Sequence, residues 1–237
     1  TLYVKIKIYG STNGGGTGGG GTGGGTPGGD TKPGDKPDDK PDDNKPDDNN
    51  PGGDTTDERF IDLGGHAWAR DAINRLAEQD IIKGVSENTF APGRNITRAD
   101  FVVLLVRAFS LTAEDTGNFA DVSKSDYFAT EMAIAKSLGI VNGVGGDNAL
   151  PRAEISRQDM MTILARTLQK TGHALEKADE SALSTFVDQA HVAGYARDSV
   201  ALLVKNGIVS GDNGAIKPNA NATRAEVAVM LDRILND

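Results

Sequence analysis

The chain has 237 residues, a formal net charge of −9 and no cysteine. This acidic balance offers no basic face for a phosphate backbone, so nucleic acid is not an expected partner. Without cysteine the chain can form neither disulfides nor thiolate metal sites, and it has no cysteine nucleophile. No apolar run is long enough for a secretory leader or a membrane span, so membrane insertion is not expected. Because the chain opens with Thr1, we expect a processed product or a fragment.

Residues 1–9 alternate between apolar and polar side chains, which is the two-residue period of a half-buried β-strand. A single strand is not stable alone, so we expect a remnant of an upstream domain or an orphan strand. The apolar positions are Leu2, Val4, Ile6 and Ile8.

Residues 10–58 are rich first in glycine and then in proline, aspartate and lysine. They have too few apolar side chains to offset the entropy of ordering, so a disordered linker is predicted. As a random coil this segment would have an end-to-end distance of about 40 Å. Paired aspartates such as Asp42 and Asp43 could instead bind Ca²⁺, but they lack the ligand spacing and glycine turn of a calcium loop. A solvated spacer is therefore the preferred interpretation.

The remainder repeats three times, over residues 59–118, 119–184 and 185–237. Each copy opens with Phe-x-Asp, continues with an aromatic residue, and reaches a glycine sixteen positions after that aromatic. Between the aromatic and the glycine, apolar residues recur at helical spacing, so each copy is predicted to begin with a helix that stops at the glycine. The three aromatics are Trp68, Tyr127 and Tyr195, and the three glycines are Gly84, Gly143 and Gly211.

A second helix is predicted to follow in each copy, beginning at Thr97, Ser156 or Thr223. These second segments are apolar around much of their circumference, which favours a buried centre. A two-helix unit cannot bury its apolar face alone, so the three copies should share one core. We therefore predict an all-α fold, a pseudo-threefold bundle of three helix-loop-helix repeats. The longer spacing between the second and third copies predicts a surface connection with a short helix.

The sequences "ITRAD" and "ATRAE" occur at the start of two of these second helices, and "ISRQD" at the third. A Thr or Ser followed three residues later by an acidic residue is a helix-capping pattern. Capping does not explain the arginine, because a cation at the first helical position faces the positive end of the helix dipole. The arginine is nevertheless present in every copy, as Arg98, Arg157 and Arg224.

Two explanations of these arginines remain open from the residues alone. Free amides at a helix N-terminus, with a guanidinium beside them, form a receptor for a carboxylate or phosphate. Alternatively, each arginine pairs with the aspartate of a Phe-x-Asp element. The first explanation predicts that Arg98→Ala weakens ligand binding and leaves the melting temperature nearly unchanged. The candidate aspartates are Asp62, Asp121 and Asp188.

The aromatic of each copy also has two interpretations. Anchoring in the core is the more common role of a lone aromatic residue. An aromatic face can instead contact the C–H side of a sugar ring, while Asp and Arg bind its hydroxyls. Only an acidic carbohydrate would use the whole set of side chains.

The order Phe-x-Asp, Trp-Ala, Gly-Ile-x-x-Gly, Phe-x-Pro and Ile-Thr-Arg-Ala-Glu resembles the S-layer homology (SLH) domain family. The first copy has "FID", "WA", "DIIKG", "FAP" and "ITRAD", and the third has "FVD", "YA", "GIVSG", "IKP" and "ATRAE". The resemblance covers about three quarters of the chain. It implies a three-lobed bundle whose grooves hold secondary cell wall polysaccharide, often with a pyruvylated N-acetylmannosamine whose ketal carries a carboxylate.

By this resemblance the chain is an extracellular module that anchors a protein non-covalently to a peptidoglycan-linked polymer, at a bacterial cell wall or S-layer. The isolated module is expected to be a monomer and to need no cofactor. The expected ligand-binding residues are Asp62, Trp68, Gly84, Thr97, Arg98, Asp121, Tyr127, Gly143, Arg157, Asp188, Tyr195, Gly211, Thr223 and Arg224.

The second copy departs most from the family pattern. Gln158 replaces alanine, Phe128 stands where a small residue is expected, and Leu150 lies one residue closer to its capping residue than Phe90 does in the first copy. The groove built on Arg157 is therefore predicted to be the poorest, and the third copy to be intermediate.

The repeats are also compatible with two other functions. One is a wall-active enzyme with these copies as its accessory, and the other is a self-assembling S-layer component. The three histidines have neither metal-ligand spacing nor a nearby nucleophile pattern, so surface or capping roles are expected. The sequence therefore predicts no metal and no catalysis here, and any enzyme would lie upstream of Thr1. The histidines are His66, His173 and His191.

Overall fold

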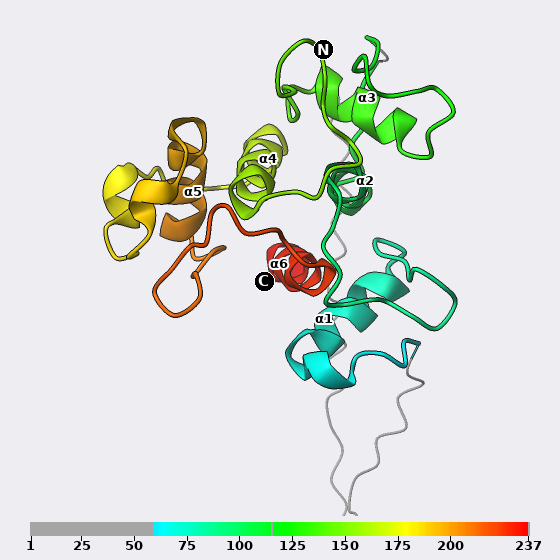
Figure 1. Ribbon diagram of the computed structural model, residues 1–237, viewed down its shortest axis with the longest axis horizontal. Helices are drawn as coiled ribbons and strands as arrows, with labels where there is room; N and C mark the ends of the chain where they lie inside the picture. Colours follow the sequence, from blue (N-terminus) through cyan, green and yellow to red (C-terminus); the bar gives the residue numbers. More distant parts are fainter. Residues whose placement is uncertain (1–58, 115, 237) are drawn as a thin grey trace, which may run out of the picture. The chain divides into compact units, whose positions relative to one another are not determined.

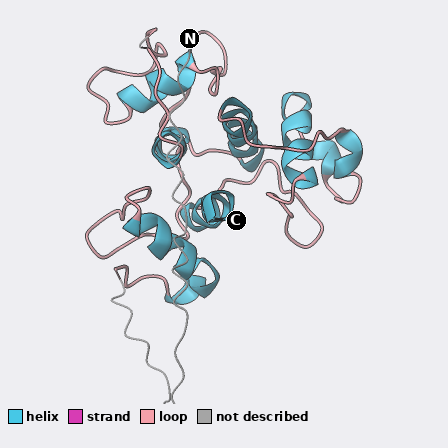
Figure 2. Ribbon diagram, turned by 180° about the vertical axis from the view of Figure 1, so that it is seen from behind, coloured by secondary structure: helices cyan, strands magenta, loops and turns pink. Residues whose placement is uncertain are grey.

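The computed structural model describes residues 59–114 and 116–236, which belong to one compact unit (Figure 1). The predicted strand over residues 1–9 and the predicted linker over residues 10–58 lie outside the described residues. The described part contains helices and loops and no β-strand, as predicted (Figure 2). Its α-helices are α1 (Ala67–Glu78), α2 (Arg98–Ala108), α3 (Ala129–Ser137), α4 (Arg157–Lys170), α5 (Arg197–Lys205) and α6 (Arg224–Asn236).

The second helices of the three copies, α2, α4 and α6, gather at the centre, and α1, α3 and α5 lie outside them (Figure 1). Each outer helix packs against the central helix of the preceding copy. Helix α3 packs on α2, α5 packs on α4, and α1 packs on α6. The packing unit is therefore built from two neighbouring copies, and the last helix closes the ring on the first.

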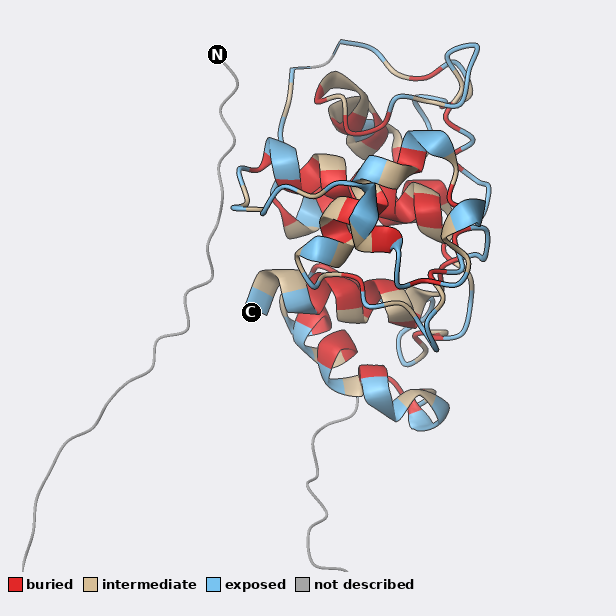
Figure 3. Cartoon of the chain, turned by 90° about the vertical axis from the view of Figure 1, so that its left-hand side faces the viewer, coloured by how far each residue is buried: buried red, intermediate tan, exposed pale blue. Residues whose placement is uncertain are grey.

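The predicted apolar faces are the buried ones (Figure 3). Helix α1 buries a stripe at spacings of three and four, and the central helices are buried around most of their circumference. The connection between the second and third copies contains a short 3₁₀ helix, η2 (Glu180–Leu183). The buried residues of α1 are Ala69, Ala72, Ile73, Leu76 and Ala77.

The outer helices stop earlier than predicted. The residue that leaves the helix with positive φ is Asp80, Gly139 or Gly207, at φ 57°, 67° and 71°. In α3, for example, the Gly139 amide donates to the Lys136 carbonyl and the next amide reaches back to Ala135, which is the Schellman closure. The glycines predicted as helix stops, Gly84 and its two counterparts, lie in the following loop instead.

Those loop glycines are required by close packing. A Cβ on Gly84 would lie 2.3 Å from the Ser86 carbonyl oxygen and 2.7 Å from Cε1 of Phe60. Gly143 and Gly211 meet the corresponding phenylalanines, and both also have positive φ, at 77° and 71°. The Phe-x-Asp phenylalanine therefore packs where only a glycine leaves room.

The Phe-x-Asp aspartate clamps a second loop of its own copy. Asp62 Oδ1 and Oδ2 accept from the amides of Phe90 and Ala91, at 2.9 and 2.7 Å. Asp121 and Asp188 make the same pair of bonds in their copies. In each copy the second clamped residue has positive φ, so the clamp holds a strained backbone in place. These second residues are Ala91, Leu150 and Lys217, at φ 59°, 51° and 54°.

The clamp also fixes the register between copies. It equates Phe90 with Ala149 and Ile216, each seven residues before the capping residue. The predicted shortening of the second copy was therefore wrong, because it compared Phe90 with Leu150.

Although burial raises the pKa of Asp188, the amides of Ile216 and Lys217 hold the pKa of that carboxyl below its ordinary value.

A closed ring of backbone hydrogen bonds joins the three copies at the centre. The Ile96 amide donates to Ala222 O at 3.0 Å, the Ala222 amide to Ile155 O at 3.1 Å, and the Ile155 amide to Ile96 O at 3.0 Å. Each of these residues stands two positions before a central helix. The ring therefore sets the starting points of α2, α4 and α6 relative to one another.

Substituting Gly84→Ala should destabilise the module by about 1–3 kcal/mol, because the added methyl group overlaps backbone and ring atoms without a change of φ. The matched control is Gly65→Ala in the same copy, where an added Cβ meets nothing within 4 Å. The control should stay within about 0.5 kcal/mol of the parent. Urea unfolding midpoints measure both, and equal midpoints for the two variants would contradict the packing role.

Candidate functional site

The central helices are capped as predicted. Thr97 Oγ1 accepts from the Asp100 amide at 3.1 Å, and Ser156 and Thr223 cap α4 and α6 in the same way at 3.3 and 3.2 Å. In the third copy the carboxylate also reaches back, since Glu226 Oε2 accepts from the Thr223 amide at 2.8 Å. The hydroxyl of each capping residue is thus committed to its helix.

The prediction of free amides beside the arginines was wrong. The Arg98 amide donates to Ala153 O and the Ala99 amide to Pro151 O, both at 2.9 Å and both in the next copy. The amides of Arg157 and Arg224 likewise donate to backbone carbonyls of the next copy in the ring. Recognition of an anion at these positions must therefore come from side chains.

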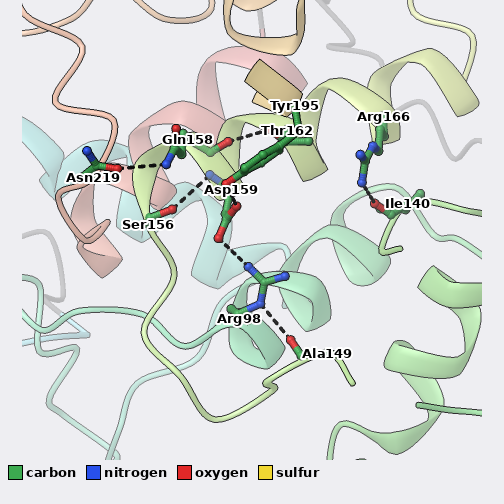
Figure 4. Close-up of polar contacts among 10 residues, drawn as sticks. All are labelled: Arg98, Ile140, Ala149, Ser156, Gln158, Asp159, Thr162, Arg166, Tyr195 and Asn219. Carbon is green, nitrogen blue, oxygen red and sulfur yellow. Dashed lines mark hydrogen bonds and ion pairs between the residues drawn. The ribbon is translucent and has the colours of Figure 1, made fainter. Parts of the chain in front are cut away.

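Each arginine reaches into the neighbouring copy. Arg98, which is buried, donates from Nε to Ala149 O at 2.9 Å and from Nη1 to Asp159 Oδ2 at 2.8 Å (Figure 4). Arg157 repeats this arrangement with Ile216 O at 3.0 Å and Glu226 Oε1 at 2.9 Å. The predicted pairing with the Phe-x-Asp aspartates was wrong, because those carboxylates bind loop amides. The acidic partner is the capping-box residue of the next copy.

Arg224 differs from the other two arginines. Its Nε donates to Phe90 O at 2.9 Å and its Nη2 to Lys83 O at 2.7 Å, and its guanidinium lies 4.5 Å from the Phe90 ring centroid. Within residues 59–114 and 116–236 no carboxylate forms an ion pair with it. Its counterpart acid, Asp100, instead accepts a hydrogen bond from the Tyr127 hydroxyl at 2.5 Å.

The three aromatics are surface residues, so the core-anchoring interpretation was wrong. Trp68 and Tyr195 are each 59% exposed and Tyr127 is 70% exposed. The Tyr195 hydroxyl donates to Asp159 Oδ1 at 2.6 Å, so Asp159 lies between the tyrosine and Arg98 (Figure 4). Partial burial, together with the bonded carboxylate, raises the pKa of Tyr127 and of Tyr195 to about 12.

Two grooves bring these side chains together. The Arg98 groove has a volume of about 400 Å³, and the Arg224 groove has a volume of about 390 Å³. Both volumes fall within the range of small-ligand sites. Each groove takes its arginine from one copy, its glycine and acid from the next, and its aromatic from the third. The Arg98 groove includes Arg98, Gly143, Asp159 and Tyr195, and the Arg224 groove includes Arg224, Gly84, Asp100 and Tyr127.

The same rotation of roles assigns Arg157, Gly211, Glu226 and Trp68 to the third junction. The ion pair between Arg157 and Glu226 shows that the arginine and the acid do meet at this junction. Gln158, which departs from the family pattern, has a structural use there. Its Nε2 donates to Asn219 Oδ1 at 3.0 Å and its Oε1 accepts from the Ala193 amide at 2.9 Å, so it ties the second copy to the third.

Two groups of groove residues were not predicted from the sequence. The capping-box acids Asp100 and Asp159 were assigned to capping alone. A further arginine, Arg107 or Arg166, lines each groove from the end of its central helix. The signal was present, since an arginine follows nine residues after Arg98, Arg157 and Arg224 alike. Conversely, Asp62 and Asp121 do not line either groove.

The described part of the chain has neither a metal-ligand cluster nor a membrane-spanning helix. Over residues 59–114 and 116–236, no three or more His, Asp or Glu side chains come together in a way that could hold a metal ion. Among the same residues, no helix has the length and apolar character needed to cross a membrane.

The described part is a tandem-repeat module, an all-helical ring of three copies in which arginines and exposed tyrosines line two grooves between the copies. Residues 59–102, 118–161 and 185–228 each match the S-layer homology domain. These matches cover more than half of the chain, which therefore belongs to the S-layer homology domain family, with three tandem copies. Membership of this family implies binding to a cell wall polymer.

Similar proteins include enzymes and S-layer proteins. The chain is 33% identical to an amylopullulanase of Thermoanaerobacterium thermosulfurigenes, over 76% of this chain and 10% of that protein. It is 29% identical to the surface-layer 125 kDa protein of Lysinibacillus sphaericus, over 72% of this chain and 14% of that protein. It is 25% identical to the S-layer protein sap of Bacillus anthracis, over 73% of this chain and 20% of that protein. The chain thus spans a fifth or less of the length of these relatives. The predicted location at the bacterial cell surface is confirmed for the family.

Arg98→Ala should lower the free energy of unfolding by about 2–4 kcal/mol, because it strands a buried carbonyl and leaves Asp159 without its cation. This replaces the expectation of an unchanged melting temperature. The control is Arg166→Ala, whose Nη1 makes only a 3.5 Å contact with Ile140 O (Figure 4). Thermal unfolding of both variants tests the difference, and a parent-like Arg98→Ala would show that the fold does not use this arginine.

The tyrosine–carboxylate bonds should make stability depend on alkaline pH. The folded-state pKa of about 12 lies above the ordinary value of 10, so the bonds stabilise fully below pH 10. Their contribution is lost as the pH rises toward 12. Tyr127→Phe with Tyr195→Phe should therefore show a smaller fall in unfolding free energy over that interval than the parent. Denaturant unfolding at several pH values measures this, and parallel curves would contradict it.

Proposed function

We propose that the chain is a non-covalent anchoring module that binds an acidic secondary cell wall polysaccharide in the grooves between its copies. In this role it would tether an exported or S-layer protein to the bacterial surface. The observation that carries the proposal is the repeated grouping of an arginine, a carboxylate and an exposed aromatic from three different copies. An aromatic left more than half exposed contributes little to a core, so its position favours contact with a ligand.

The groove side chains suit a charged sugar. The ring face of Tyr195 can contact the C–H face of a pyranose, while Asp159 and the tyrosine hydroxyl can bind its hydroxyls. The Arg98 guanidinium uses Nε and Nη1 within the protein, which leaves Nη2 for a carboxylate on the ligand. A pyruvylated amino sugar carries such a carboxylate beside an apolar ring face. The predicted ligand-binding roles of the arginines, aromatics and glycines thus remain our proposal.

Two other roles draw on the relatives. Some of them are named as S-layer proteins and others as glycoside-degrading enzymes. A self-assembling lattice component is the alternative for the first group, and an accessory anchor beside an upstream enzyme is the alternative for the second. Size-exclusion chromatography, with and without purified wall polymer, separates these. An anchor stays monomeric and binds, whereas a lattice component associates without polymer.

The decisive experiment compares two substitutions of one groove residue. Tyr195→Ala removes the ring, whereas Tyr195→Phe keeps it and removes only the hydroxyl. Because ring contact supplies about 1–3 kcal/mol in stacking on planar ligands, we expect Tyr195→Ala to weaken binding to native wall sacculi about tenfold or more. Tyr195→Phe should retain most of the binding. Co-sedimentation with sacculi, before and after chemical removal of the polysaccharide, provides the measurement.

The matched control is Ile61→Ala, another exposed apolar residue, at 75% exposure, that lines neither groove. It should bind like the parent. Trp68 is the only tryptophan of the chain, so its fluorescence reports selectively on the third junction. Undiminished sedimentation after the polysaccharide is removed would overturn the proposed ligand.

A further inference from the structure

The two grooves differ in charge. The Arg224 groove is lined by four cationic side chains and one carboxylate, whereas the Arg98 groove is lined by two cations and one carboxylate. The Arg224 groove therefore carries a net charge of +3, in a protein whose formal net charge is −9. The four cationic residues of the Arg224 groove are Lys83, Arg94, Arg107 and Arg224.

Two of these cations lie outside the repeat pattern. Arg224 corresponds to Arg98, and Arg107 corresponds to Arg166, so both belong to every groove. The register set by the aspartate clamp equates Arg94 with Ala153 and Ala220. The glycine that follows Lys83 equates it in the same way with Asn142 and Ser210. The fold therefore does not need a charge at either position, because the other two copies do without one.

The backbones of Lys83 and Arg94 both contact Arg224. The Arg224 Nη2 donates to the carbonyl of Lys83 at 2.7 Å, and the Arg224 amide donates to the carbonyl of Arg94 at 2.9 Å. Burial lowers the pKa of the Arg224 guanidinium; the charge of Asp100 opposes this shift, and the nearby Arg94 adds to it. Like charges that line one groove repel one another, and an anion bound between them relieves this repulsion.

The protein itself supplies little compensation. The side chains of Lys83 and Arg94 are exposed, and neither has an acidic partner among residues 59–114 and 116–236. Arg107 lies 3.9 Å from Glu131, at the limit of an ion pair. Asp100, the one carboxylate in the groove, is bonded to the Tyr127 hydroxyl. The Arg224 groove is therefore ready to accept more negative charge than its counterpart.

We propose that the Arg224 groove binds a glycan unit with two anionic groups, and that Lys83 and Arg94 form the second anion subsite. This rests on the proposed function, in which the groove arginine receives the carboxylate of an acidic sugar. The second group is a phosphate or a uronic acid carboxylate on the adjoining sugar. A lysine ammonium and an unpaired guanidinium both serve this chemistry. The Arg224 groove is then selective for the more highly charged stretches of the polymer.

The test uses three synthetic disaccharides that share one pyruvylated amino sugar. Its neighbour is a neutral amino sugar, a phosphorylated amino sugar or a uronic acid. Calorimetry of the parent module should show one site that binds a doubly charged probe about tenfold more tightly than the neutral-neighbour probe. Lys83→Asn with Arg94→Ala, which copies the second repeat, should abolish this preference. Binding of the neutral-neighbour probe should fall by a smaller factor than binding of the doubly charged probes, because the carbonyls that hold Arg224 remain.

A charge-matched control removes two exposed lysines outside both grooves, by Lys124→Asn with Lys170→Ala. It should keep the preference, and loss of the preference there would attribute it to bulk charge and overturn the subsite. The reverse experiment, Asn142→Lys with Ala153→Arg, should give the Arg98 groove the same preference. Both substituted positions are exposed, so this variant should fold.

The outcomes separate the two proposals. A parent module that binds all three disaccharides equally retains its anchoring role and overturns the second subsite. A parent that binds neither the disaccharides nor wall sacculi overturns the anchoring proposal, and the subsite falls with it. Preference for only the phosphorylated or only the uronic acid probe supports the subsite and identifies its anion.

Discussion

The ring of three backbone hydrogen bonds at the centre is the constraint on which the other features of the module depend. It connects Ile96, Ile155 and Ala222, one residue from each copy. Because these residues stand just before the central helices, the ring fixes where each helix begins and brings its first amides against carbonyls of the next copy. The arginine at the first helical position then donates to a carbonyl of the neighbouring loop. Groove geometry follows from the ring rather than from any single copy.

The exchange of helices between copies extends the same constraint. Each outer helix packs on the central helix of the preceding copy, so no copy holds its own apolar surfaces together. The ring closes where α1 meets α6, and there Arg75 Nε donates to Asp232 Oδ1 at 2.9 Å, with Asp232 buried. A buried carboxylate that lacked its cation would be costly, so this contact favours the closed arrangement over an open chain of helices. Three copies are therefore the smallest unit with a complete core.

Much of the fold could be predicted because its signals are local. The spacing of Ala69, Ile73 and Leu76 defines a helical face, and a Thr followed by Asp three residues later defines a cap. The partners of Arg98 could not be predicted this way. Asp159 lies 61 residues away, in a copy whose placement depends on the central ring. Residue types alone left Asp62 as one candidate partner. That carboxylate instead holds Ala91 at positive φ, a conformation that an alanine in a sequence does not predict.

The exposure of the aromatic residues was also not predictable from the sequence. A lone aromatic is more often a core residue, and Phe60 and Phe90 do follow that rule at 1% and 2% exposure. Tyr195 does not, because its helix packs on α4 in a way that leaves the ring at the junction of three copies. Spacing showed that the residue recurs, while only the arrangement of copies shows which side it faces. Repetition thus located the site, and packing between copies determined its composition.

Under the proposed function, the arginines contribute to both stability and ligand recognition. Arg98 satisfies a carbonyl and a carboxylate of the next copy with two of its three nitrogens, so it is needed by the fold before any ligand arrives. A ligand in a groove would touch all three copies at once and could only do so in the closed ring. Binding at a hundredfold excess over its Kd would then add about 2.7 kcal/mol to the unfolding free energy. An anchor built this way is held closed most firmly when it is attached.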